Sequence, residues 1–261
     1  MVARLSLAII PSKSGWEEDD ELKSITLPYN MIKSSEGSSY WTPTTLTQAI
    51  AGSWFAGSHQ PWINLHFVFL ELCNRPDYAD LLRREIAAHS SLDVTTITLL
   101  PLLDSFIKEC LRLNPLDEMG IRRKALEPFT FSNGGPSLAV GDIACVSAYD
   151  ILHNTAKYPS PHDFDGMRFV QNSTEAPATS EGMRGTYLTD ASKDWPIWGL
   201  GSRVCPGRWH AALVLKMAVV KLLANYEFRL KDEKARHKWW WETFQLPSGG
   251  TEVLFRKRGS E

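Results

Sequence analysis

The pattern of apolar and polar positions predicts a helical first half of the chain. Thr42 followed by Pro43 is typical of a helix N-cap and a first helical residue, and apolar positions then continue for about 30 residues. Further helices are expected over residues 77–89 and over residues 99–113, where an Asn-Pro pair ends the pattern. A fourth helix is expected to follow Cys205 directly, because a long apolar run begins there.

Shorter apolar runs, broken by turn residues, predict small antiparallel strands in the second half. Two of them cover residues 129–131 and 143–146. Near the C-terminus the runs cover residues 226–230 and 244–255, and the Pro-Ser-Gly-Gly sequence inside the last run predicts a hairpin turn.

The remaining segments lack a regular period. Residues 1–41 and 158–194 are rich in Ser, Gly and Pro, so irregular structure is expected in both. The sequence therefore predicts a mainly α fold with small antiparallel β-sheets. Residues 1–41 are expected to form an irregular N-terminal segment, and residues 42–261 are expected to form one ordered domain.

The composition excludes several classes of protein. The 261 residues are 43% hydrophobic and 22% charged, which suits a globular core. A formal net charge of -2 gives no reason to expect a nucleic-acid partner. The four cysteines include no CxxC pair, which fits a reducing compartment better than a zinc cluster or a disulfide framework. The first ten residues suit neither a signal peptide nor a membrane anchor, so the chain as written is expected to be cytoplasmic.

Residues 198–208, with the sequence WGLGSRVCPGR, carry the strongest chemical signal. The glycines let the backbone bend tightly beside a flat ligand, and Cys205 precedes Pro-Gly and an apolar helix. The dipole and the free N–H groups of a helix N-terminus favour a thiolate. A lone thiolate can be the axial ligand of haem iron, and Arg203 is placed to pair with a haem propionate.

This segment resembles the cysteine-ligand loop of the cytochrome P-450 family, the haem-thiolate monooxygenases. The family pattern is an aromatic residue, Gly, any, Gly, any, Arg, any, Cys, any, Gly. Its fixed places are filled here by Trp198, Gly199, Gly201, Arg203, Cys205 and Gly207. The resemblance implies haem (iron protoporphyrin IX) as the cofactor, held by this loop, with Cys205 as the metal ligand. The alternative is a Gly-rich turn around a buried, inert cysteine.

The resemblance runs from about residue 42 to residue 256 and corresponds to the second half of the family's usual chain. It implies a truncated cytochrome P-450 fold and a monooxygenase that oxidises an apolar small molecule. O2 and electrons from an NADPH-dependent reductase are the implied co-substrates. The sequence is similar in style to fungal secondary-metabolism members, and full-length members of this type usually sit on the endoplasmic reticulum membrane.

Glu109 and Arg112 lie one helical turn apart, a spacing that by itself fits a solvent-facing ion pair. In the family, however, they are similar to a Glu and an Arg that form a buried network with an arginine of the so-called meander segment. Residues 158–169 resemble that segment and nominate Arg168 as the third member. The implied role of this network is to hold the cysteine loop in register.

The long first helix contains Gly57 and Pro61. Pro61 has no N–H for the carbonyl of Gly57, so a kink is expected there. The segment is similar to the oxygen-binding groove of the family, and Gly57 matches the glycine that makes room for oxygen. The usual acid and alcohol are replaced by His59 and Gln60, which are weak candidates for proton delivery. A core or surface histidine without a catalytic role is the alternative for His59.

Arg123 resembles the strand arginine that contacts a haem propionate, with Arg122 as its substitute and a solvated arginine as the alternative. Cys73, Cys110 and Cys145 are expected to be small buried residues.

A basic run over residues 231–238 precedes three consecutive tryptophans, a combination that suits contact with a membrane interface. A solvated loop with partly packed rings is the favoured alternative.

The sequence leaves other functions open. One is a truncated remnant that has no catalytic activity. Another is a haem-dependent isomerase or dehydratase of the same fold, which needs no proton relay and therefore suits His59 and Gln60.

Overall fold

The computed structural model describes residues 26–132, 134–170 and 187–259. In the first of these ranges, helix α2 (Leu27–Ser35) occupies part of the segment that was expected to be irregular. The hydroxyl of Thr26 accepts a hydrogen bond from the N–H of Tyr29 and caps the helix, and Pro28 lies in its first turn. No side chain of α2 is buried, so the helix does not need the apolar period by which helices are recognised in a sequence. Residues 1–25 lie outside the described residues.

Helix α3 (Pro43–Asn74) confirms the long helix predicted from residue 42. The hydroxyl of Thr42 accepts from the N–H of Thr45 at 3.2 Å, as expected of an N-cap, and the helix continues through Pro61. Its buried side chains begin at Pro61. Two compact units, Met1–Ala56 and Gly57–Glu261, divide within this helix, whereas the sequence suggested a boundary near residue 41.

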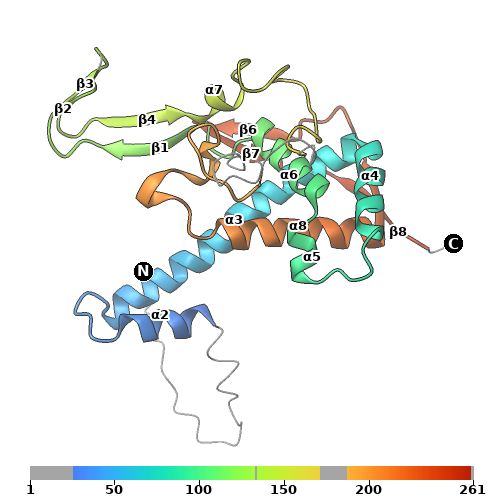
Figure 1. Cartoon of the computed structure of the whole chain (residues 1–261), viewed down its shortest axis with the longest axis horizontal. Coiled ribbons are helices and arrows are strands. Elements are labelled where there is room, and N and C mark those ends of the chain that lie inside the picture. Colours follow the sequence, from blue (N-terminus) through green and yellow to red (C-terminus); the bar gives the residue numbers. More distant parts are fainter. Residues whose placement is uncertain (1–25, 133, 171–186, 260–261) are drawn as a thin grey trace, which may run out of the picture. The chain divides into compact units, whose positions relative to one another are not determined.

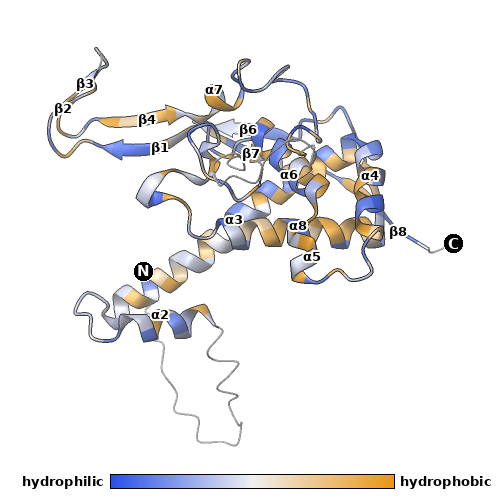
Figure 2. Cartoon of the chain, in the orientation of Figure 1, coloured by the Kyte–Doolittle hydropathy of each residue, from blue (hydrophilic) through white to orange (hydrophobic). Residues whose placement is uncertain are grey.

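The main core of the second unit surrounds helix α8 (Arg208–Asn225). Helices α4 (Pro76–Ala87), α5 (Val94–Thr98) and α6 (Pro101–Leu113) pack against it, and α5 is an addition to the predicted elements. Figure 1 shows these helices side by side, and Figure 2 shows the hydrophobic colour along much of α8. Helix α6 has no N-cap side chain of its own, and the Glu85 carboxylate of α4 accepts from the N–H groups of Leu102 and Leu103 at 2.7 and 2.9 Å.

Small antiparallel sheets follow α6, as predicted. Strand β1 (Met119–Lys124) pairs with β4 (Ile143–Ser147), and β2 (Phe129–Thr130) pairs with β3 (Ser137–Leu138). These strands project together as a narrow ribbon (Figure 1). The short helix α7 (Ala148–Leu152) follows β4 and was not predicted.

The predicted hairpin near the C-terminus is wrong. Strand β7 (Phe244–Pro247) pairs with β6 (Lys238–Trp241), while β8 (Val253–Lys257) pairs with β5 (Tyr226–Leu230). The Pro-Ser-Gly-Gly sequence therefore connects two sheets. The tryptophans form a strand and not a loop, because cross-strand contacts hold them: Trp239 Nε1 donates to the carbonyl of Pro247, and Trp241 stacks on Phe244.

The fold is mainly α with small antiparallel sheets, as the sequence predicts. Residues 158–170 and 187–194 contain no helix and no strand longer than a single bridge, which agrees with the irregular structure expected there. The other residues between 170 and 187 lie outside the described ranges. Among the helices that the structure describes, none combines the length and the hydrophobicity required to cross a bilayer.

Candidate functional site

The cysteine loop, residues 198–207, is shaped by glycines in backbone conformations that other residues avoid. Gly199 has φ 75° and ψ -174°, and a Cβ added there would lie 3.2 Å from the carbonyl oxygen of Arg203. Gly201 has φ 63° and faces open space. Gly199 is therefore required both by its conformation and by a close approach of backbone, whereas Gly201 is required by conformation alone.

Cys205 is fixed at both its backbone groups. Its N–H donates to the carbonyl of Trp198 at 2.7 Å, which closes the loop, and its carbonyl accepts from Arg208 Nη1 at 2.8 Å. The side chain is half-buried. Helix α8 begins three residues later, at Arg208, so the cysteine precedes the helix N-terminus and is not part of its first turn.

Trp198, at the start of the loop, is buried and anchors it to the segment before it. Its indole Nε1 donates to the carbonyl of Leu188 at 2.6 Å. Arg208 repeats the connection, because its Nε donates to the carbonyl of Thr189 at 3.0 Å. Sequence reasoning missed this role of Arg208, although the residue stands inside the same motif as Cys205.

The other cysteines differ from Cys205 in their surroundings. Burial raises the pKa of Cys73 to about 12 and also raises the pKa of the fully buried Cys110, so both remain neutral thiols. Cys73 is only half-buried and Cys145 is exposed, which corrects the expectation that both are buried. None of these three lies in a glycine-shaped loop.

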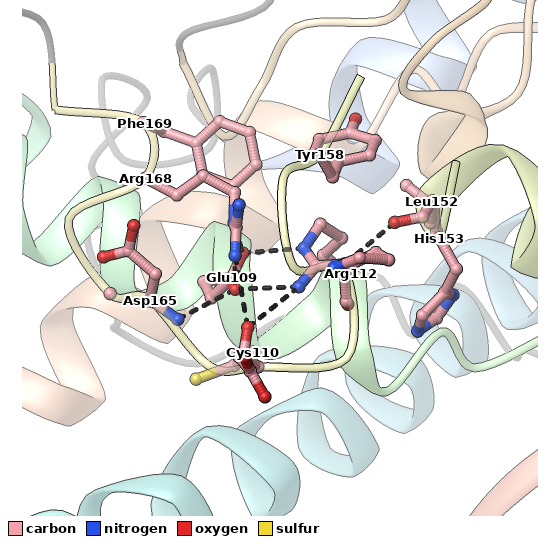
Figure 3. A network of polar contacts seen from close by, with 12 residues as sticks. Glu109, Cys110, Arg112, Leu152, His153, Tyr158, Asp165, Arg168 and Phe169 are labelled. Carbon is pink, nitrogen blue, oxygen red and sulfur yellow. Dashed lines mark hydrogen bonds and ion pairs between the residues drawn. The ribbon is translucent and has the colours of Figure 1, made fainter. Parts of the chain in front are cut away.

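Glu109 and Arg112 form a completely buried ion pair, so the solvent-facing alternative is wrong (Figure 3). Arg112 Nε lies 2.7 Å from Glu109 Oε2, and its Nη2 lies 2.8 Å from Oε1. Arg168 joins them, with its Nε 3.1 Å from both carboxylate oxygens. The structure thus brings together the three residues that the resemblance to the family nominated.

The remaining donors of this network bind backbone groups of residues 152–168. Glu109 also accepts from the N–H of Asp165 at 3.0 Å. The carbonyl groups that the two arginines reach belong to Leu152, Pro159, Pro161 and Asp163. The network therefore organises the irregular segment before residue 170, because every donor of a buried guanidinium requires an acceptor.

Gly57 lies beside the first turn of α8. A Cβ added to Gly57 would have as its nearest neighbour His210 Nε2, at 3.9 Å. His59 and Gln60 follow on α3, and both are exposed. Their suggested part in proton delivery stays a prediction.

Two of the three arginines considered for a propionate are available to an anion. Arg122 forms an ion pair with Asp117 and donates to Thr243 at 2.7 Å, and the bond to Asp117 raises the pKa of Arg122. Within the described ranges, Arg123 donates to the carbonyl of Arg122 and to no other group. Arg203 is exposed and makes no hydrogen bond or ion pair with the residues that the structure describes. These contacts favour Arg203 and Arg123.

The donor set suits haem. A half-buried thiol stands on a fixed backbone, two arginines are available for carboxylates, and Gly57 has no side chain beyond its Cα. A surface pocket of about 350 Å³ is lined in part by Leu200 of the loop and by Asp190 and Trp209. Its lining does not include Cys205, so we do not assign it to the cofactor.

A family model described as Cytochrome P-450 matches residues 15–255, and the chain belongs to this family. It is 30% identical over 223 residues to the cytochrome P-450 monooxygenase janQ of Penicillium janthinellum. It is 31% identical over 220 residues to paxQ of Penicillium paxilli and 31% identical over 242 residues to ptmQ of Penicillium ochrochloron, which carry the same description. These alignments cover 82–88% of this chain but only 42–45% of the relatives, so the chain spans less than half of their length.

Solved structures agree on the fold. The crystal structure of a cytochrome P-450, CYP102L1, superposes with a TM-score of 0.66 at 20% identity, covering 84% of this chain and 47% of that one. The retinoic acid-bound cyanobacterial CYP120A1 superposes with a TM-score of 0.59 at 21% identity, covering 74% and 42%. The chain therefore has the fold of part of a cytochrome P-450, as the sequence predicts.

We predict that Gly199→Ala is more damaging than Gly201→Ala. The first substitution places a side chain in a glycine-only conformation against the Arg203 carbonyl and is expected to cost about 3 kcal/mol, while the second costs about 1 kcal/mol. Urea unfolding of both variants measures the difference. Equal losses of stability would contradict the close approach at Gly199.

We predict that Glu109→Gln lowers the free energy of unfolding by about 3–5 kcal/mol, because the buried Arg112 and the partly buried Arg168 then lose their shared counter-charge. Thermal unfolding of the variant measures the effect. The matched control is Glu252→Gln, which breaks the exposed pair with Lys231 and is expected to leave the transition unchanged. A wild-type transition in Glu109→Gln would refute the dependence of the network on charge.

Proposed function

We propose that the chain binds haem through Cys205 and acts as a cytochrome P-450 monooxygenase that oxidises an apolar small molecule. The observation that carries the proposal is the position of Cys205, half-buried in a loop closed by its bond to Trp198 in a chain of this family. Because the chain spans less than half of its relatives, the activity of the whole protein is part of the proposal.

Each residue of the site has a role in this proposal. The sulfur of Cys205 holds the iron, and the bonds from its backbone to Trp198 and Arg208 keep the sulfur in place. Arg203 and Arg123 bind the propionates as charge-assisted donors. When bound, haem supplies the activation of O2 that allows a C–H bond to be oxidised.

The residues on α3 leave room for a small ligand and deliver protons in this proposal. Gly57 leaves room on the helix for a small ligand, since no Cβ projects there. In this proposal the imidazole of His59 delivers the proton, and the amide of Gln60 holds the water through which the proton passes. The exposure of both side chains supports access to that water.

The wider role follows the family. Its members bind small substrates and generally use a reductase, and we propose an NADPH-dependent reductase as the electron donor here. The fungal relatives support a place in secondary-metabolite biosynthesis. The half-exposed tryptophans of β6 support membrane contact at the endoplasmic reticulum, which is where we propose that the protein works, on the cytoplasmic side.

We predict that the reduced, carbon monoxide-bound chain, reconstituted with haem, shows the red-shifted Soret band of thiolate-ligated haem. Cys205→Ala is expected to lose the band completely, because no other thiol lies in the loop. The control Cys145→Ala, which removes an exposed cysteine, is expected to keep it. Absence of the band in the wild type would favour the remnant without catalytic activity. A band without coupled consumption of NADPH would favour the isomerase or dehydratase.

We predict that haem protects one thiol from alkylation. In the haem-free chain at pH 8, iodoacetamide is expected to modify Cys145 and Cys205, while Cys73 and Cys110 stay unmodified because burial keeps them protonated. Addition of haem is expected to slow the reaction at Cys205 by at least about tenfold and to leave Cys145 unchanged. Mass spectrometry of peptides gives each rate. Equal rates at Cys205 with and without haem would argue against iron ligation by this sulfur.

A further inference from the structure

Helix α6 carries a second buried ionic cluster, which is separate from the Glu109 network. It consists of Asp104 and Lys108, one turn apart on α6, and Lys216 on α8. Lys108 is fully buried, and the other two residues are exposed by 3–7% of their surface. Burial of a charged group costs free energy unless the group is paired. The partners of these three side chains therefore show which part of the chain the cluster fixes.

The cluster grips two consecutive residues of the chain. Asp104 forms an ion pair with Lys216, and its Oδ2 accepts from the N–H of Leu188 at 2.6 Å. Lys108 Nζ donates to the carbonyl of Tyr187 at 3.0 Å. Two side chains of α6 therefore hold both backbone groups of the peptide bond that joins residues 187 and 188.

Lys108 is also confined from the side. Its ammonium group lies 4.6 Å from the ring centroid of Phe169 and 4.8 Å from that of Trp195. Burial lowers the pKa of Lys108 to about 8, so keeping the charge inside is unfavourable for the stability of the fold. The Lys108 ammonium group is therefore better suited to positioning the backbone that it binds than to stabilising the fold.

Residues 187–189 are connected to Cys205 by hydrogen bonds. The carbonyl of Leu188 accepts from the indole of Trp198 at 2.6 Å, and the carbonyl of Trp198 accepts from the N–H of Cys205 at 2.7 Å. A parallel route runs from the carbonyl of Thr189 through the guanidinium of Arg208 to the carbonyl of Cys205. Residues 187–189 are therefore bonded to α6 on one side and to the cysteine loop on the other.

The neighbouring network does not provide this connection. Lys108 and Glu109 are adjacent in sequence but point to different segments. The partners of Glu109, Arg112 and Arg168 lie within residues 152–168. Within the described residues, the side-chain hydrogen bonds that join α6 to residues 187–189 are those of Asp104 and Lys108.

We propose that Lys108 and Asp104 are positioning residues for Cys205, acting on the cysteine loop through the backbone of residues 187–189. The effect of these residues on an iron ligand rests on the proposed function. Their effect on the backbone of residues 187–189 and on the cysteine loop is a property of the chain without cofactor. The two claims are therefore tested by separate measurements.

The first measurement is amide hydrogen exchange of the full, haem-free chain. Lys108→Met keeps an unbranched side chain of similar length and removes the donor. It is expected to speed exchange at the N–H groups of Leu188 and Cys205 about tenfold, while Asp165, held by Glu109, exchanges at the wild-type rate. The matched control, Lys221→Met on the exposed face of α8, is expected to change none of these rates.

Two outcomes of this measurement would overturn the proposal. One is wild-type exchange at Leu188 and Cys205 in Lys108→Met. The other is a uniform increase that includes Asp165, since that result describes a general loss of stability. Asp104→Asn is the second variant: it retains an oxygen acceptor for the N–H of Leu188 but removes the charge that pairs with Lys216, so faster exchange at Cys205 supports the proposal only if Asp165 again exchanges at the wild-type rate.

The second measurement uses the haem-loaded chain and the reduced, carbon monoxide-bound spectrum. Lys108→Met is expected to shift at least half of the haem from the thiolate-ligated band to the band of haem without a thiolate ligand, at a total haem content equal to that of Lys221→Met. An unchanged band would overturn the proposed influence on the ligand. If the wild type itself gives no thiolate band, the proposed function fails. The exchange rates then still decide whether Lys108 positions the cysteine loop through residues 187–189.

Discussion

The pairing of charged side chains buried in helix α6 is the constraint on which the rest of the second unit depends. Asp104, Lys108, Glu109 and Arg112 are all buried on this one helix. A buried charge without a partner costs several kcal/mol, so each of these groups requires an acceptor or donor from elsewhere. Lys216 of α8 is one partner, and most of the others come from residues 158–170 and 187–188, which lack regular structure and are held to α6 by these bonds. One helix thereby organises much of the chain around it.

The cysteine loop receives its shape from a different source. Gly199 and Gly201 supply backbone angles that other residues avoid, and the bond from Cys205 to Trp198 closes the turn. The loop is then anchored through Trp198 and Arg208 to residues 188 and 189. The sulfur is consequently presented by fixed backbone while its own surface stays half-open, an arrangement that suits a ligand atom.

Much of the site was predictable from sequence because its signals are local. The six fixed residues of the cysteine motif, the turn spacing of Glu109 and Arg112, and the N-cap at Thr42 each lie within a few positions of their partners. Resemblance to the family added Arg168. The predicted C-terminal hairpin was wrong because a Pro-Ser-Gly-Gly sequence specifies a turn but not which strands pair. Helix α2 was missed because it buries no apolar face.

The sequence by itself determined the class of fold, the family and the cysteine loop, since the apolar period and the motif residues are written in consecutive positions. Only the tertiary structure decided which charges are buried, which arginines remain available, and that Asp104 and Lys108 reach the segment before the loop. The physical reason is that burial and pairing depend on groups about 80 residues apart, and their proximity follows from chain packing, which spacing does not encode.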